Sequence, residues 1–283
     1  MKIAFWSEQK EVGTSFNLAV VACAAVWLHP LSVAVVSGGY HDDKLERKFF
    51  GKRGSVFEAS AEAQRFEQEG ILAAETQEFF LTRGLECLLR KERPQDLTEG
   101  LVKANMRQIV KDRMYCLPAS MKKEHEWWYQ DHQFRRMGRV MDAVDSYFDV
   151  VFIDCSSRQD DYAKKVFREA DVCVLNMDQE AEAIGKFYSN PPDYKGKVFF
   201  LLGKYFGDAL YTRKNLQRVY RVEEDRLGAI PFNPQLHAAD QMGRIESGVR
   251  RYVNGEGAEL ESEFGKELVR TTNLLLRQAG LVA

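Results

Sequence analysis

The sequence predicts an α/β fold, a mostly parallel, doubly wound sheet of about seven strands with helices on both faces. Short apolar runs alternate with segments of helical periodicity over most of the 283 residues, which is the order that a parallel sheet with crossover helices requires. Several runs are apolar at every position, as expected for strands that helices cover on both faces. One large α/β domain can reach this length.

The expected strands are short apolar runs, at Ile3–Trp6, Ser32–Ser37, Met114–Leu117, Val150–Asp154, Val172–Asn176, Val198–Leu202 and Leu227–Ile230. The expected helices lie between and around them, at residues 17–28, 43–50, 74–91, 97–112, 124–147, 159–169, 180–188, 212–221 and 259–279.

Residues 51–112 interrupt this alternation, because they are charged, mostly helical in pattern and without a convincing strand. They form either a helical elaboration at one edge of the sheet or a small subdomain. Since no Pro/Gly/Ser-rich linker flanks them, the sequence favours a single domain over residues 1–283 with a helical elaboration at about 51–112.

Composition argues against several simple functions. Forty Lys and Arg against 42 Asp and Glu give a net charge of -2, so binding to nucleic acid or an anionic membrane through the overall field is not expected. The five cysteines are spread singly, which favours a reducing cytoplasm over a disulfide framework. The apolar stretch 17–28 is shorter than the ~20 residues that a membrane span needs. We therefore expect a cytoplasmic protein without a transmembrane segment.

The loop after the first strand is the first candidate for chemistry. Ligands of open parallel sheets bind outside the carboxyl ends of the strands, and a helix N-terminus placed there favours an anion. A working phosphate loop has several glycines and a Lys followed by Ser or Thr, but here Gly13 is followed by Thr14. The hydroxyls of Thr14 and Ser15 could cap the helix, touch a phosphate or hold magnesium. An ordinary capped strand-to-helix turn is the alternative.

The second candidate is Asp154, which ends the apolar run Val150–Asp154. An apolar strand ending in an acidic residue is the Walker B pattern, in which the carboxylate lies near a magnesium ion. Many buried strands also end in Asp for solvation or capping, so the pattern gains its value from its order after the glycine loop.

Together these segments resemble the ParA/MinD family of deviant Walker A ATPases, a SIMIBI branch of the P-loop NTPases. The resemblance covers most of the chain, with gaps in 51–112, and is carried by Lys2-Ile-Ala-Phe-Trp-Ser7, Val12-Gly-Thr-Ser15, Asn17-Leu-Ala19, Leu117-Pro-Ala-Ser120, Phe148-Asp-Val-Val-Phe-Ile-Asp154, Leu202-Gly-Lys-Tyr205 and Leu227-Gly-Ala-Ile-Pro-Phe-Asn233. Within the family the chain looks most like the TadZ/CpaE-type branch, which is associated with tight-adherence pilus assembly.

The resemblance implies ATP or ADP with magnesium as cofactor, and it implies roles for particular residues. The residues that would surround the phosphates are Lys10, Glu11, Val12, Gly13, Thr14 and Ser15. Ser15 and Asp154 would lie near magnesium, and Lys204, Pro231 and Asn233 would flank the base. The resemblance assigns no catalytic residue here. It implies a homodimer, with pilus or secretion ATPase components as partners.

The loop also departs from the family's pattern. Lys10 is the only candidate for the signature lysine, and Thr14 replaces the second one. Glu8 and Glu11 put carboxylates beside a triphosphate, which is unfavourable without a compensating cation. We therefore expect a degenerate site with weak or absent nucleotide binding and no efficient hydrolysis, in a localisation or scaffolding protein of pilus or secretion machinery.

Two alternatives stay open. One is an active ATPase of a plasmid-partition or conjugative-element system with an atypical loop, and the other is a regulatory module whose pocket binds a different ligand. The last helix, 259–279, has an apolar stripe, and MinD-like proteins bind membranes through such a helix. Its polar face mixes acidic and basic residues, so packing onto the domain is expected, with peripheral membrane contact as the alternative.

Overall fold

The structure, a computed structural model, describes residues 1–8, 12–37, 43–51, 84–91, 93–119, 132–155, 161–179, 182–189, 193–255 and 258–282. Within them, eight strands form one sheet in the order β3-β4-β2-β5-β1-β6-β7-β8. The strands are β1 (Lys2–Trp6), β2 (Val33–Ser37), β3 (Arg107–Val110), β4 (Met114–Leu117), β5 (Val150–Asp154), β6 (Val172–Met177), β7 (Val198–Tyr205) and β8 (Leu227–Pro231). All neighbouring pairs are parallel except β3 and β4. The predicted α/β class is confirmed.

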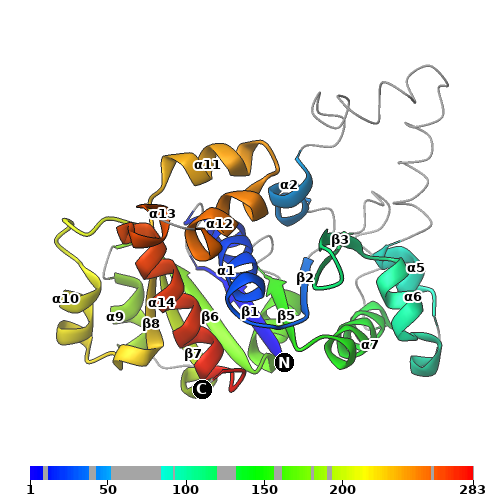
Figure 1. The fold of residues 1–283 in the computed structure, drawn as a ribbon. Helices are drawn as coiled ribbons and strands as arrows, with labels where there is room; N and C mark the ends of the chain where they lie inside the picture. The colour runs from blue at the N-terminus through cyan, green and yellow to red at the C-terminus, as the bar shows by residue number, and fades with distance from the viewer. Residues whose placement is uncertain are drawn as a thin grey trace.

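Helices cover both faces of this sheet (Figure 1). The first face carries α1 (Thr14–Leu28), α2 (Lys44–Phe50), α11 (Pro234–Gln241), α12 (Ile245–Asn254) and α14 (Glu263–Gln278). The second face carries α5 (Leu85–Leu89), α6 (Glu99–Ala104), α7 (His132–Tyr147), α8 (Asp161–Glu169), α9 (Glu182–Ser189) and α10 (Arg213–Tyr220). Short helical turns are η2 (Pro94–Asp96), η4 (Lys195–Lys197), η5 (Glu224–Arg226) and α13 (Ala258–Glu261). The molecule is thus a three-layer α/β/α sandwich.

The central elements follow from their apolar sequences. Every residue of β5 is buried, and its side chains alternate between the two cores, with Phe152 on one face and Ile153 on the other. Helix α1 is apolar nearly all round and is buried from Leu18 to Val26, because it packs against β1, β2, β5, α12 and α14. Figure 1 shows α1, α12 and α14 side by side in front of the sheet.

Several elements differ from those predicted from the sequence, beginning at the edge of the sheet. The helix expected over 97–112 is α6 followed by the antiparallel strand β3, so the sheet has eight strands rather than about seven, and the segment 51–112 does contain a strand. Helices α11 and α12 were not predicted. The helix expected over 259–279 is divided by Ser262, whose hydroxyl caps α14 through the Gly265 N–H. Residues 52–83 of the expected elaboration lie outside the described residues.

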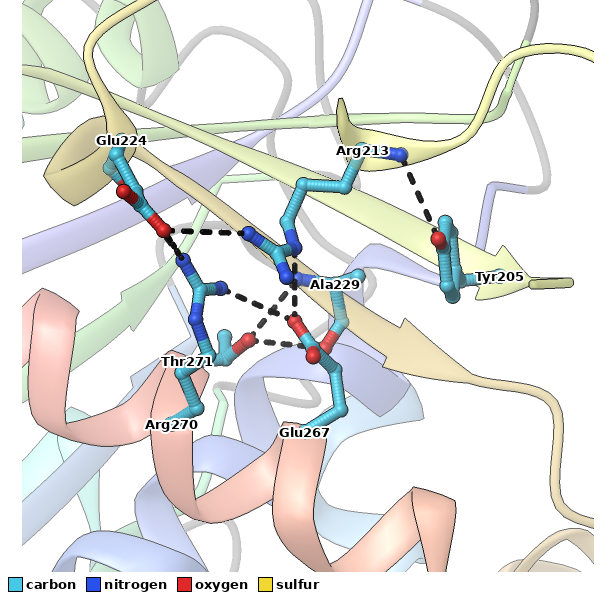
Figure 2. Close-up of polar contacts among 7 residues, drawn as sticks. All are labelled: Tyr205, Arg213, Glu224, Ala229, Glu267, Arg270 and Thr271. Atoms are coloured by element: carbon cyan, nitrogen blue, oxygen red, sulfur yellow. Dashed lines mark hydrogen bonds and ion pairs between the residues drawn. The ribbon is translucent and has the colours of Figure 1, made fainter. Parts of the chain in front are cut away.

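The last long helix packs back onto the domain, as expected. Leu268, Leu275 and Leu276 of α14 are fully buried against α1 and the edge strand β8. The Thr271 hydroxyl accepts a hydrogen bond from the Ala229 N–H at 2.9 Å and donates one to the Ala229 carbonyl at 3.0 Å (Figure 2). These bonds satisfy backbone groups on the outer side of β8, which an edge strand would otherwise leave open.

A cluster of four charged side chains links α10 on one face of the sheet to α14 on the other, around the β8 edge (Figure 2). Arg213 of α10 and Arg270 of α14 both contact Glu267, at 3.3 and 3.2 Å, and both face Glu224 of η5, at 3.9 and 3.6 Å. Arg213 and Glu267 are only 14% and 16% exposed, so solvent screens this pair less than a surface ion pair. The cluster joins α10, η5 and α14 at the β8 edge.

Thr271→Val is expected to lower the free energy of unfolding by about 2–4 kcal/mol. Valine has the shape of threonine but leaves both buried Ala229 groups unpaired, and each such group costs ~1–3 kcal/mol. The neighbouring Thr272→Val is the matched control, because the Thr272 hydroxyl is also buried but has no hydrogen-bond partner in the part of the chain that the structure describes. Urea unfolding should show little or no loss for Thr272→Val. Equal losses for the two variants would contradict the role of Thr271.

None of the described helices is both long enough and apolar enough to cross a membrane.

Candidate functional site

The carboxyl ends of the central strands bring the candidate acidic residue into the middle of the sheet. Asp154 ends β5 and lies opposite Phe5 of β1 on one side and Ser37 of β2 on the other. Asp154 is 3% exposed, and Ser37 is 5% exposed. Because this carboxylate is buried, it does not serve to solvate the end of the strand. It lies at the edge of the sheet where ligands of parallel sheets bind.

The loop after β1 leads directly into the N-terminus of α1 at the same edge. Gly13 has the left-handed backbone conformation φ 80°, ψ 29°, in which other residues are strained, and a Cβ on it would meet nothing within 4 Å. Gly13 has no side chain to cap α1, and the first turn of α1 carries no acidic residue. Thr14 and Ser15 follow in that turn, at 6% and 8% exposed. The helix N-terminus thus has the polarity that favours an anion.

Two buried asparagines fasten this loop to the neighbouring strand. The Asn17 side chain in α1 donates to the Asn176 side-chain oxygen in β6 at 3.0 Å, and the Asn176 amide donates to the Trp6 carbonyl at 3.5 Å. Both asparagines are 1% exposed. Because β6 is the neighbour of β1, these bonds fix the start of α1 over the carboxyl ends of both strands.

Gly203 brings the end of β7 against the same loop. A Cβ at this position would lie 2.6 Å from the Val12 carbonyl oxygen and 2.6 Å from the Asn17 side-chain nitrogen. Only a glycine allows the two backbones to approach this closely. The loop therefore rests on β6 through Asn176 and on β7 through Gly203.

The three residues expected beside a base lie at the carboxyl ends of β7 and β8. Pro231 is opposite Tyr205, and Lys204 has a left-handed φ of 48° at an irregular register between the two strands. Asn233 is already used locally, because its side-chain oxygen accepts from the Leu236 N–H at 3.0 Å and caps α11. Lys204 and Pro231 are thus brought together, whereas the Asn233 side chain serves the fold.

An exposed aromatic pair lies next to these residues. The rings of Phe206 and Phe232 stack with centroids 5.8 Å apart and an interplanar angle of 30°, and they are 55% and 48% exposed. The Gln179 side chain orders this loop by accepting from the Phe206 N–H at 2.8 Å and donating to the Phe206 and Tyr211 carbonyls at 2.9 and 3.1 Å. Hydrogen bonds from Gln179 therefore hold the backbone that carries Phe206 of this aromatic pair.

The predicted site residues are partly assembled at one edge. Val12 and Gly13 precede α1, Thr14 and Ser15 begin it, and Asp154 ends the central strand β5. Lys204 is the last residue but one of β7, and Pro231 ends β8. Lys10 and Glu11 lie outside the described residues. No cluster of three or more His, Cys, Asp or Glu suited to a metal occurs in the described part of the chain. A magnesium ion held by one carboxylate, one hydroxyl and ligand phosphates needs no such cluster.

The fold matches that of solved ParA/MinD-type ATPase structures. Among solved structures, the chain is similar to a ParA family ATPase from Chlorobium tepidum TLS, with a TM-score of 0.63 and 14% identity over 96% of this chain and 97% of that one. It is similar to MinD of Pyrococcus horikoshii OT3 complexed with Mg-ADP, with a TM-score of 0.60 and 15% identity over 100% and 98% of the two chains.

A putative plasmid partition protein from Borrelia burgdorferi B31, bound to AMPPNP, matches with a TM-score of 0.56 and 14% identity over 98% of both chains. At these identities the similarity establishes the shared fold. No protein-family model matches the sequence, and no curated protein does.

The site contains contacts that the sequence prediction did not include. Asn17 and Asn176 stand out as polar residues within otherwise apolar segments, and that pattern is a readable signal for a buried polar contact. Gly203 gives no comparable signal, because its importance depends on how close β7 comes to the loop in space.

Proposed function

We propose that this chain is a ParA/MinD-like localisation or scaffolding protein of pilus or secretion machinery, with weak nucleotide binding and no efficient ATP hydrolysis. The pilus or secretion role and the homodimeric state rest on the sequence resemblance to the TadZ/CpaE-type branch. The nucleotide part rests on the geometry of the loop and on its residue types.

One observation carries the nucleotide part: α1 begins at a left-handed glycine at the sheet edge where the buried Asp154 ends β5, yet Thr14 occupies the position after that glycine. The N–H groups of Thr14 and Ser15 would face a phosphate, and Ser15 with Asp154 would lie near magnesium. Bound Mg-ATP would supply the phosphoanhydride and the divalent cation. Threonine contributes no positive charge, so the phosphates would be held mainly by backbone dipoles.

The test is a titration of the full chain with ATP and ADP, with and without magnesium, by calorimetry and thermal unfolding. A ligand at 100 times its dissociation constant stabilises a protein by about 2.7 kcal/mol, which corresponds to a shift of roughly 5–10 °C at this size. We expect much smaller shifts at 1 mM nucleotide and no measurable turnover. Light scattering on the same samples tests the dimer, which would have twice the 32.5 kDa chain mass.

Thr14→Lys tests whether the site is correctly located. A lysine there would add a cation to an otherwise suitable loop, so ATP should bind about tenfold or more tightly, while Thr14→Ala should bind no better than the unchanged chain. Unchanged affinity in Thr14→Lys would place the site elsewhere.

The second candidate is an active ATPase of a plasmid-partition or conjugative-element system. The similarity to the AMPPNP-bound plasmid partition protein favours it. Micromolar ATP affinity, with turnover that Asp154→Ala abolishes, would support this candidate and overturn the degenerate site.

A further inference from the structure

A cavity lies at the end of β7 and β8 that is opposite the loop after β1. It has a volume of about 430 Å³ and is lined by Phe187, Tyr188, Lys195, Gly196, Val198, Phe200, Arg221, Glu223 and Arg226. Val198 is the first residue of β7, and Arg226 directly precedes β8. Gly203 and Lys204 are near the carboxyl end of β7, about 20 Å away along the strand. The cavity is therefore separate from the candidate nucleotide site.

Three aromatic rings and Val198 form the apolar lining of the cavity. Phe187 lies edge-on to Phe200, with ring centroids 5.0 Å apart, and edge-on to Tyr188, with centroids 5.5 Å apart. Phe200 is 2% exposed whereas Tyr188 is 45% exposed, so the cluster extends from the core to the surface. An apolar side chain entering the cavity would meet the edges and faces of these three rings, of which Phe200 is buried in the core.

The charges around these rings are mostly positive. Three cations and one carboxylate line the cavity, and the carboxylate of Glu223 is paired with Arg226 at 2.6 Å. Arg226 also donates to the Gly196 carbonyl at 3.0 Å, so it is held by the protein itself. Among the described residues, the side chains of Lys195 and Arg221 form no hydrogen bond and no ion pair. Two cations thus lie unneutralised beside an aromatic surface.

The backbone at Arg221 adds an independent observation. Arg221 ends α10 in the left-handed conformation, φ 54° and ψ 37°, where glycine or asparagine is usual. This conformation is strained for an arginine and would not be for a glycine. The Arg221 side chain lines the cavity. A strained residue with an unpaired charge is a reason to look for a ligand.

We infer that this cavity is a docking site for an acidic segment of a partner protein. One aromatic or large aliphatic side chain of that segment, with an acidic residue on each side of it in the partner's sequence, would enter the cavity. The inserted side chain would pack on Phe187, Tyr188 and Phe200, and the flanking carboxylates would pair with Lys195 and Arg221. The cavity has the size of small ligand sites, which suits one side chain and its neighbours. The Tyr188 hydroxyl stays protonated, because burial and then Glu223 raise its pKa, and it can donate to a carboxylate.

The test uses the full chain and a fluorescein-labelled peptide, Gly-Glu-Phe-Glu-Gly, followed by fluorescence anisotropy. We expect saturable binding with a dissociation constant below about 1 mM. The peptides Gly-Lys-Phe-Lys-Gly and Gly-Glu-Ala-Glu-Gly test charge and apolar side chain separately, and both should bind at least about tenfold more weakly. No binding of the first peptide, or equal binding of either control, overturns the proposal.

Variants locate the binding. Arg221→Glu and Lys195→Glu should each weaken binding about tenfold or more, whereas Lys214→Glu, the same charge change at an exposed α10 position outside the cavity, should not. Arg221→Gly separates binding from folding, because it removes the cation and relieves the left-handed strain. It should unfold at the same or a higher temperature while binding more weakly. Binding that is equal in Arg221→Glu and Lys214→Glu would exclude this cavity.

Discussion

Gly243→Ala is expected to lower the free energy of unfolding by about 3–5 kcal/mol. Gly243 follows α11 with φ 66°, and a Cβ on it would lie 1.9 Å from the Gly51 nitrogen and 2.4 Å from the Gly51 Cα. Both are backbone atoms, so no side-chain rotation relieves the overlap. The two turns are also joined by Lys48 and Asp240 at 2.8 Å.

Gly280→Ala is the matched control for this substitution. Gly280 has nearly the same backbone conformation, with φ 70°, but a Cβ there would meet nothing within 4 Å. Gly280→Ala should lower the free energy of unfolding by only about 1 kcal/mol, the strain of an alanine in the left-handed conformation. Urea unfolding of both variants isolates the close approach of the two backbones. Similar losses in the two variants would mean that the ends of α2 and α11 do not touch.

The central sheet was predictable because its strands are buried on both faces. Val150–Asp154 and Met114–Leu117 are continuous apolar runs, and the structure has strands with these bounds. The edge strand β3 was not, because Arg107–Val110 is only four residues long, partly exposed and polar in its first half. Within a charged segment such a pattern resembles a helix. Antiparallel pairing with β4, a tertiary contact, decides its conformation.

Helix α11 carried a signal that the prediction did not use. Asn233 followed by Pro234 is a typical N-cap and first helical residue, and both have these roles in the structure. The same cap explains why Asn233 is a poor candidate for base contact, since its oxygen already accepts from Leu236. Gly13 and Asp154, in contrast, lie at the carboxyl edge of the sheet, where the order of strands and helices alone places them.

Gly203→Ala is the variant expected to affect the candidate nucleotide site most strongly. The added Cβ would lie 2.6 Å from the Val12 carbonyl oxygen, so either β7 or the loop must move. Asn17 would have to turn away as well, and this breaks its 3.0 Å bond to Asn176. Overpacking of this kind and a broken buried hydrogen bond together cost about 2–4 kcal/mol.

Hydrogen exchange distinguishes a local change at the loop from a general loss of stability. In Gly203→Ala, the amides of residues 12–17 and of Asn176 should exchange faster than in the unchanged chain, even at temperatures well below unfolding. Gly138→Ala is the control, because a Cβ at this helical glycine meets nothing within 4 Å and should stabilise α7 slightly. If the amides of residues 12–17 are as well protected from exchange in Gly203→Ala as in Gly138→Ala, β7 does not support the loop. The candidate site would then lack the contact with β7 that its geometry requires.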